Sequence, residues 1–266
     1  MKVVSILLCL LMLSVLSLSA TAAQEVKEVK KTVTLNPDGR VSIDTFKGSV
    51  TVTAWDRPQV DIQARVEADE ESDDQAQTVQ NTEVDIEASE SSVWIKSDYE
   101  KLQDWHSAFD DDNIRFPYVH YTISMPRTAQ LTIKDFKSTL KVTGLRSHLK
   151  INSFKGPITI SGFEGSLDLD TFKSEVRVEF VTLFQRNRIE TFKGTVDLVL
   201  PKGKGFDLDA DIGHGDLDAD FEFSVKRLSR GRSRSYRDIE YRGAVNGGGP
   251  TLSLRTHKGN YRLRQR

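Results

Sequence analysis

A short phrase that keeps returning in the middle of the chain limits what the chain can fold into. It consists of an aliphatic residue, a polar pair, and then Phe-Lys-Gly or Phe-Lys-Ser. Its phenylalanines are 18, 18 and 20 residues apart and stand at Phe136, Phe154, Phe172 and Phe192. A fixed period of this length is typical of stacked repeats, in which each repeat buries its apolar side against its neighbours.

Each repeat contains two strand-like halves in which apolar and polar residues alternate, which is the period of a half-buried β-strand. A shift of 18 residues places apolar residues on apolar residues, as in the column Leu140, Ile158 and Val176. Successive repeats therefore pair most simply as parallel strands about 4.8 Å apart. The sequence predicts an all-β fold built around a parallel β-solenoid, similar to a β-helix.

The first residues have the composition of a secretory signal peptide, predicted over residues 1–23. Met1 and Lys2 precede an apolar run that ends in small residues near Ala23. The run is shorter than the ~20 residues that span a bilayer, which disfavours the alternative of an uncleaved anchor. Cys9, the single cysteine, lies inside this segment, so the mature chain would contain no disulfide. We therefore expect an exported bacterial protein, located in the periplasm, on the cell surface or secreted.

The mature chain divides into two predicted parts. Residues 24–128 form an N-terminal β module with an early copy of the phrase around Phe46 and an acidic insertion, expected to be a short helix or loop. Residues 129–266 contain the solenoid repeats, a basic loop and a charged last strand. That strand, from Tyr261 to Arg266, is expected to protect an open sheet edge by its charge.

The repeated Phe-Lys pairs are the first candidate site. In one interpretation the rings form a corner of the core and the lysines keep the surface soluble. In the other, the rings point outward and form, with the lysines, a strip that binds acidic polysaccharide, lipid headgroups or a partner protein. The candidate ligand-binding residues are Phe136, Lys137, Phe154, Lys155, Phe172, Lys173, Phe192 and Lys193.

The two ends of the mature chain carry opposite charge. Residues 67–112 contain 16 acidic and 2 basic side chains, whereas residues 226–266 contain 2 and 12. An anionic envelope polymer, a phosphate-bearing lipid or the acidic part of the same chain could occupy the basic end, and a plain solvated loop is the alternative. Because the chain is exported, we expect no nucleic-acid partner. The candidate anion-binding residues are Arg227, Arg230, Arg232 and Arg234.

No metal or cofactor site is predicted. A series of alternating carboxylates would face one way on two strands, but its spacing departs from that of EF-hands and of calcium-binding β-rolls. We expect a solvated outer face, with a calcium site as the alternative. These carboxylates are Asp207, Asp209, Asp211, Asp216, Asp218 and Asp220. The sequence has no Gly-x-Ser-x-Gly, no His-Glu-x-x-His and no phosphate loop, so we expect that the protein is not an enzyme.

Several stretches together resemble a known family. They run from Gly39 to Asp56, from Tyr121 to Pro126, through the repeats, and from Gly247 to Gly259. Over nearly its whole mature length the chain is similar to the bacterial "putative adhesin" family of β-strand-repeat domains of unknown function. The resemblance implies an exported, non-enzymatic β-solenoid and supplies no catalytic residues. Family members usually carry small polar residues where this chain has Phe-Lys, so the resemblance predicts no ligand.

Together these observations predict an exported envelope or surface protein that acts as a non-catalytic binding or structural element. One alternative is a carbohydrate-active enzyme on a β-helix scaffold, because carboxylates are abundant. Another is an envelope-stress regulatory or sensing protein, in which the acidic and basic ends bind each other until a ligand separates them. The sequence leaves the oligomeric state open.

Overall fold

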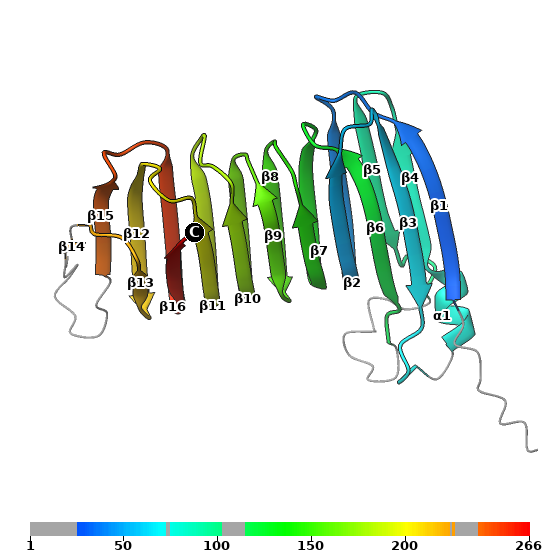
Figure 1. Cartoon of the computed structure of the whole chain (residues 1–266). Helices are drawn as coiled ribbons and strands as arrows, with labels where there is room; N and C mark the ends of the chain where they lie inside the picture. Colours follow the sequence, from blue (N-terminus) through cyan, green and yellow to red (C-terminus); the bar gives the residue numbers. More distant parts are fainter. Residues whose placement is uncertain (1–25, 73–74, 103–114, 224, 227–238) are drawn as a thin grey trace, which may run out of the picture.

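The structure, a computed structural model of the 266-residue chain, describes residues 26–72, 75–102, 115–223, 225–226 and 239–266 (Figure 1). This part of the chain is all-β, as predicted, with one short helix. The predicted signal peptide, residues 1–23, lies outside the described residues. In chain order the elements are β1 (Val26–Thr34), β2 (Arg40–Trp55), β3 (Gln59–Glu67), α1 (Gln75–Asn81), β4 (Glu83–Ala88), β5 (Ser92–Asp98), β6 (Tyr118–Pro126), β7 (Gln130–Thr143), β8 (Leu149–Lys155), β9 (Ile158–Phe163), β10 (Leu167–Phe180), β11 (Asn187–Leu200), β12 (Phe206–His214), β13 (Leu217–Ala219), β14 (Val225–Lys226), β15 (Ile239–Val245) and β16 (Thr251–Gln265).

The middle of the sheet is a row of parallel strands whose register follows the sequence repeat. β7 pairs with β8 and β9, both of these pair with β10, and β10 pairs with β11. Leu140 lies opposite Ile158, which lies opposite Val176, so the predicted column is confirmed. The early copy of the phrase joins the same row, because Val50 of β2 pairs with Leu140 of β7.

The long strands bend halfway, so that the sheet folds over and encloses the core. The first half of β7 pairs with β8 and its second half with β9, and β10 is divided in the same way. Gly156 (φ 129°) and Gly194 (φ 140°) stand at the bend in a backbone region that other L-residues rarely adopt. A Cβ on Gly156 would lie only 2.1 Å from the carbonyl oxygen of Ser138, so neighbouring strands can approach closely there.

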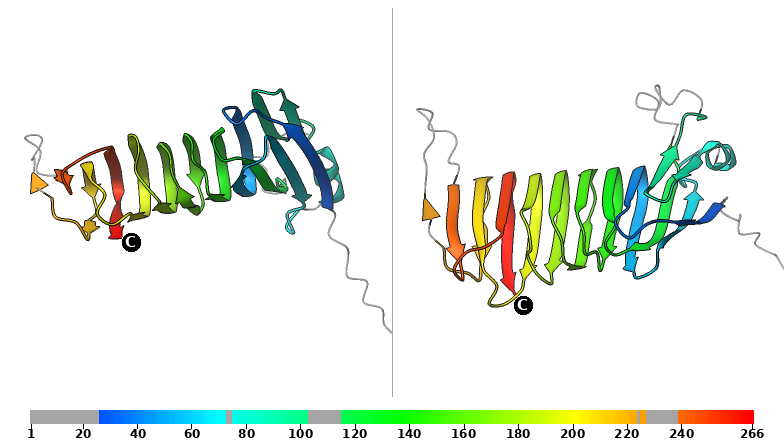
Figure 2. Two further views of the ribbon diagram at one scale, coloured as in Figure 1. Left: turned by 45° about the horizontal axis from the view of Figure 1, so that its top comes forward. Right: turned by 90° about the horizontal axis from the view of Figure 1, so that it is seen from above.

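Further strands extend this row at both ends, where β6 and β5 pair in parallel with β2 and the remaining strands form antiparallel pairs (Figures 1 and 2). At one end β6, β3 and β1 extend the second half of β2, and β5 and β4 extend its first half. Lys27 and Lys31 on β1 donate hydrogen bonds to the carbonyl groups of Thr82 (2.8 Å) and Ile86 (3.0 Å), which closes this end of the core. The helix α1 lies in the acidic insertion and buries Val79. At the other end β15 and β14 extend β12.

The strand order departs from a plain solenoid near the C-terminus. β16 lies between β11 and β12, although it follows both in the sequence. Its Tyr261 pairs with Val196 and its Leu263 with Leu198, and all four side chains are fully buried. The last strand is therefore an inner strand, and the expectation of a charged open edge from Tyr261 to Arg266 is wrong.

The charged side chains of β16 face acidic residues of the neighbouring strands. Arg264 lies 2.7 Å from Asp218 and 3.3 Å from Asp220, and Arg262 lies 3.8 Å from Asp197. These arginines therefore form ion pairs with neighbouring strands on the surface of the sheet and do not protect an open edge.

The predicted boundary at residue 128 falls inside a continuous core. β2, from the first predicted part, pairs with β7, from the second. One cluster of buried side chains extends through both parts. The division into two domains stays a prediction.

Candidate functional site

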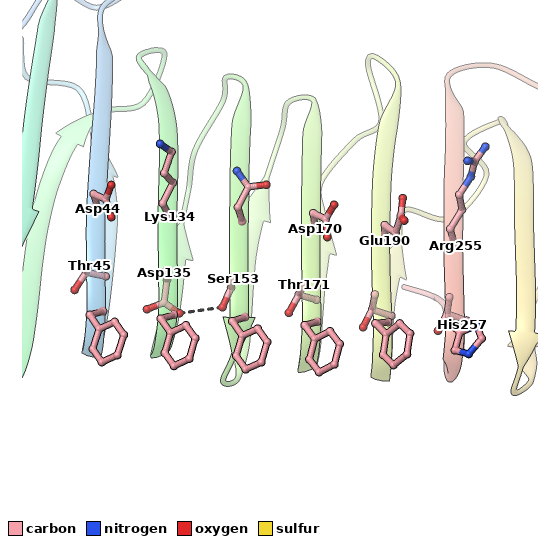
Figure 3. A pocket seen from close by; sticks show the side chains of 18 of the residues that line it. Asp44, Thr45, Lys134, Asp135, Ser153, Asp170, Thr171, Glu190, Arg255 and His257 are labelled. Carbon is pink, nitrogen blue, oxygen red and sulfur yellow. Dashed lines mark hydrogen bonds between the residues drawn. The ribbon is translucent and has the colours of Figure 1, made fainter. Parts of the chain in front are cut away.

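Aromatic rings from successive strands form a straight row on the surface, which we call the aromatic strip (Figure 3). Neighbouring phenylalanine rings lie 4.8 to 4.9 Å apart between centroids with planes within 5° of each other. This distance equals the spacing of the strands, so the rings stack with an offset. The rings of Phe136, Phe154, Phe172 and Phe192 are about 40% exposed (39 to 43%). The strip consists of Phe46, Phe136, Phe154, Phe172, Phe192 and His257.

The rings lie outside the core because a different residue of each repeat turns inward. Asp135, directly before Phe136, points into the bend, and small hydroxyl residues do so in the other strands. The interpretation of the rings as a buried corner of the core is therefore wrong. The inward side chains, which we call the inner row, are Thr45, Asp135, Ser153, Thr171, Thr191 and Thr256.

Lysines directly after the rings form a second row, the lysine column, along the bend of the sheet. Strand register places Lys137 beside Lys155, and Lys173 beside Lys193. Lys258 lies between Lys193 and His214, because β16 lies between β11 and β12. The column consists of Lys47, Lys137, Lys155, Lys173, Lys193 and Lys258.

Most of the lysine column lacks a counter-charge. Within the described residues, Lys137, Lys155, Lys173 and Lys193 are exposed and have no carboxylate within 4.0 Å. The ammonium groups of one strand and the next would repel by about 1 kcal/mol in water at ~5 Å separation, an arrangement that an anion can relieve.

Lys47, at one end of the column, differs because the chain supplies its own anion. Its ammonium group donates to the carboxylate of Asp69 and to the Phe116 carbonyl (3.4 Å) and lies 3.8 Å from the centre of the Tyr118 ring. Burial is the largest single influence on Asp69 and would raise its pKa, but the hydrogen bonds from Lys47 and from the Glu71 backbone N–H, together with the charges of Lys47 and Arg115, outweigh burial and the pKa is lowered. The acidic segment before α1 therefore closes this end of the column.

A groove of about 960 Å³ runs along the other side of the aromatic strip. Its opposite wall is formed by side chains two residues before each ring, which share the outer face with the rings because side chains alternate along a strand (Figure 3). We call them the polar row: Asp44, Lys134, Asn152, Asp170, Glu190 and Arg255.

The polar row has mixed charge, and part of it is neutralised by Arg188 of β11. The guanidinium of Arg188 pairs with Glu190 and with Asp168 (2.9 Å), and lies 3.9 Å from Asp170. Burial, followed by the neighbouring charge of Glu190, raises the pKa of Asp170. No described residue pairs with the side chains of Asp44 or Asn152, so these remain available to a ligand.

The remaining predicted sites have different outcomes. Arg227, Arg230, Arg232 and Arg234 lie outside the described residues. In the acidic series, Asp209 pairs with Arg242 (3.2 Å), and Asp218 and Asp220 pair with Arg264. In the described ranges no group of three or more potential metal-ligating side chains is found.

Sequence reasoning missed two parts of this site. The first is the polar row, whose signal was its spacing of two residues before each phenylalanine. The second is the contact of Asp69 with Lys47, which joins residues far apart in the sequence and has no local signal.

Comparison with known proteins gives distant similarities only. No protein-family model matches the chain, and no curated protein does. The chain resembles solved structures described as adhesins. A putative cell adhesion protein from Clostridium sporogenes is 14% identical, with a TM-score of 0.46 over 91% of this chain and 100% of that chain.

Two further solved structures are similar at lower scores. A putative adhesin from Bacteroides fragilis is 9% identical with a TM-score of 0.31, covering 90% of this chain and 97% of that chain. A putative lipid binding protein from Parabacteroides distasonis is 8% identical with a TM-score of 0.27, covering 89% and 96%. Likenesses this distant assign no ligand. Among the described residues, no helix has the length and apolar character needed to cross a bilayer.

Proposed function

We propose that the protein is an exported, non-catalytic binding protein of the bacterial cell envelope or surface, and that it holds an anionic partner through the lysine column and the aromatic strip. One observation carries the proposal. Lys137, Lys155, Lys173 and Lys193 repeat at the strand spacing, are exposed and have no carboxylate partner among the described residues. The exposed rings beside them add apolar contact to the charge.

The chain itself provides an example of such binding. At Lys47 a carboxylate and an aromatic ring together hold the ammonium group, and both partners of this ion pair are largely buried. The next lysines occupy the same register position without a carboxylate. A partner with repeated anionic groups would supply what Asp69 supplies at the first position.

Export and the absence of catalysis belong to the proposal. Export rests on the composition of residues 1–23, with their basic start, apolar run and small-residue end. A binding role is supported at the groove because Arg188 pairs with Glu190 and lies 3.9 Å from Asp170, so two of the groove's carboxylates are held beside a counter-charge. Incubation with envelope glycans should release no new reducing ends, and turnover would favour the carbohydrate-active enzyme instead.

The proposal is tested by the binding of the mature chain to immobilised dextran sulfate, with neutral dextran as reference, at low and physiological salt. The variant carries Lys137→Gln, Lys155→Gln, Lys173→Gln and Lys193→Gln. We expect its affinity for dextran sulfate to fall by at least about tenfold, because four exposed charge contacts are lost.

The matched control removes the same number of positive charges elsewhere, through Lys141→Gln, Arg177→Gln, Lys202→Gln and Lys204→Gln. These side chains are exposed and lie away from the strip. If both variants lose affinity equally, net charge explains the binding and the lysine column is not the site.

A further inference from the structure

We infer that the occupant of the groove is a linear acidic polysaccharide that lies across the strands, with its sugar rings against the aromatic strip and its acid groups on the lysine column. The inference rests on the proposed function and names the chemical class of its partner. Three aligned rows, one polar, one aromatic and one cationic, carry it.

The shape of the surface favours a linear polymer. The groove crosses the strands from β2 to β16 and beyond, and each strand adds one side chain to each of its walls. A polymer with repeating units could contact equivalent groups on successive strands. Its length is limited at the β2 end, where Phe116 and Tyr99 pack against Phe46.

The polar row favours a sugar over a membrane surface. Asp44, Asp170 and Glu190 stand on the same outer face as the rings, so an anionic bilayer pressed onto this face would meet carboxylates. Carboxylates and amides beside an aromatic ring instead suit a hydroxylated ring, which has an apolar face and hydrogen-bonding edges. Asp44, Asn152 and Arg255 have no side-chain partner among the described residues and are open to such bonds.

The lysine column favours acidic sugars over neutral ones. It follows the rings by one residue in every strand, so acid groups of a polymer lying over the strip come within reach of the ammonium groups. The contact between Asp69 and Lys47 shows that this position accepts a carboxylate.

A polypeptide fits this surface less well. Extended peptides bind sheets by pairing with the free backbone of an edge strand. The strands that carry the site, β7, β8, β10, β11 and β16, have neighbours on both sides, so their backbone groups are already used. Only side-chain contacts remain for an occupant.

The experiment compares four probes on the mature chain: an oligogalacturonate, polyaspartate with the same number of charges, a neutral malto-oligosaccharide, and vesicles of phosphatidylglycerol and phosphatidylcholine. We expect the oligogalacturonate to bind at least about tenfold more tightly than polyaspartate, since only a sugar uses the rings and the polar row.

Variants of the rings decide the cause of this preference. Phe154→Leu with Phe172→Leu should abolish the preference for the oligogalacturonate, lowering the affinity for it by more than the affinity for polyaspartate. Phe154→Tyr with Phe172→Tyr keeps the rings and should retain the preference. Thermal unfolding of each variant establishes that it is folded at the temperature of the assay.

The outcomes separate this inference from the proposed function. Equal affinity for the oligogalacturonate and polyaspartate, or a preference that survives the leucine changes, overturns the polysaccharide as occupant. Binding to vesicles without binding to the oligogalacturonate also overturns it, in favour of a lipid surface, and leaves the proposed function standing. Failure to bind any anionic probe overturns both.

Discussion

The hydroxyl group of Ser153 donates a hydrogen bond of 2.9 Å to the buried carboxylate of Asp135 on the neighbouring strand (Figure 3). The same carboxylate oxygen accepts a bond from the Ser138 backbone N–H (3.0 Å), whereas the other oxygen has no partner among the described residues. Burial raises the pKa of Asp135, and these hydrogen bonds offset only part of the shift. Every other member of the inner row is a threonine or serine. Asp135 is therefore the one member of the inner row that places a carboxylate in a buried position, which costs stability at neutral pH.

Replacement of this acid should stabilise the protein. In Asp135→Thr the inner row would match its neighbours, and no charge would have to be buried at neutral pH. We expect a gain of about 1 kcal/mol in the free energy of unfolding at neutral pH, measured by urea denaturation. Loss of stability instead would show that the hydrogen bonds to Ser153 and Ser138 outweigh the burial of charge.

The pH dependence of that gain follows from the direction of the pKa shift. Because the pKa of Asp135 is higher in the folded than in the unfolded chain, its contribution is most favourable below the ordinary carboxyl pKa of about 4 and is lost as the pH rises through the folded value. The benefit of Asp135→Thr should therefore shrink in acid. A benefit that does not change with pH would mean that the carboxylate is not responsible.

Gly156 should tolerate no side chain. Its φ of 129° is unfavourable for alanine, and the new Cβ would lie 2.1 Å from the Ser138 carbonyl oxygen. We expect Gly156→Ala to lower the free energy of unfolding by about 3 kcal/mol or more, as measured by thermal unfolding. Gly203→Ala is the matched control, since Gly203 also has positive φ (72°) but open space around it. Its cost should be about 1 kcal/mol, and equal costs would exclude the close approach of strands as the cause.

The hydroxyl group of Tyr261 should anchor the last strand. It lies 2.7 Å from the carbonyl oxygen of Arg255 and 3.0 Å from that of Ile189, in a fully buried position. Tyr261→Phe leaves these carbonyl groups without this donor and should lower the free energy of unfolding by about 1 to 3 kcal/mol. Tyr241→Phe, at a partly buried ring, should change it by less than about 0.5 kcal/mol. If Tyr261→Phe leaves the free energy of unfolding unchanged, packing of the ring alone holds β16 in place.

The ion pair of Lys47 and Asp69 should be strongly coupled. Because both side chains are largely buried, removal of one partner by Lys47→Gln or Asp69→Asn should cost roughly 3 kcal/mol, and the double variant should cost less than the sum. Urea denaturation of the four proteins gives the coupling energy. Additive costs would mean that the two groups do not interact in solution.

This ion pair should also respond to acid in the direction opposite to Asp135. The pKa of Asp69 is lowered, so its stabilising effect is present above the ordinary carboxyl pKa and is lost as the pH falls through the folded value. Asp69→Asn should therefore flatten the loss of stability in acid. An unchanged acid profile would assign that loss to other carboxylates.

The periodic part of the fold could be predicted from the sequence because side-chain alternation and repeat length determine strands and their register. Columns such as Leu140, Ile158 and Val176 need parallel neighbours one repeat apart, and the structure has them. The position of β16 could not be predicted in this way. Tyr261 and Leu263 fit the apolar columns of any repeat, so alternation shows which face they occupy but not which strands lie beside them.

Part of the candidate site could be predicted from the same alternation of side chains along each strand. Ile133 points inward, so Lys134 and Phe136 must point outward, and the rings could have been placed on the surface by this rule alone. The expectation that aromatic residues enter the core competed with it. The groove could not be predicted, because neighbouring residues of its walls lie far apart in the sequence: Asp44 and Lys134 are separated by 90 residues, and Glu190 and Arg255 by 65.

The place of β16 has a consequence for the order in which the protein can be completed. Synthesis proceeds from the N-terminus, so β11 and β12 emerge before the fifteen residues that must lie between them. Until then these two strands cannot reach their final separation, and the far end of the molecule has no finished surface. The sheet can therefore be completed only after the whole chain has been synthesised. A chain truncated near its C-terminus would leave the edges of β11 and β12 unpaired, and a protease or chaperone can recognise such exposed edges.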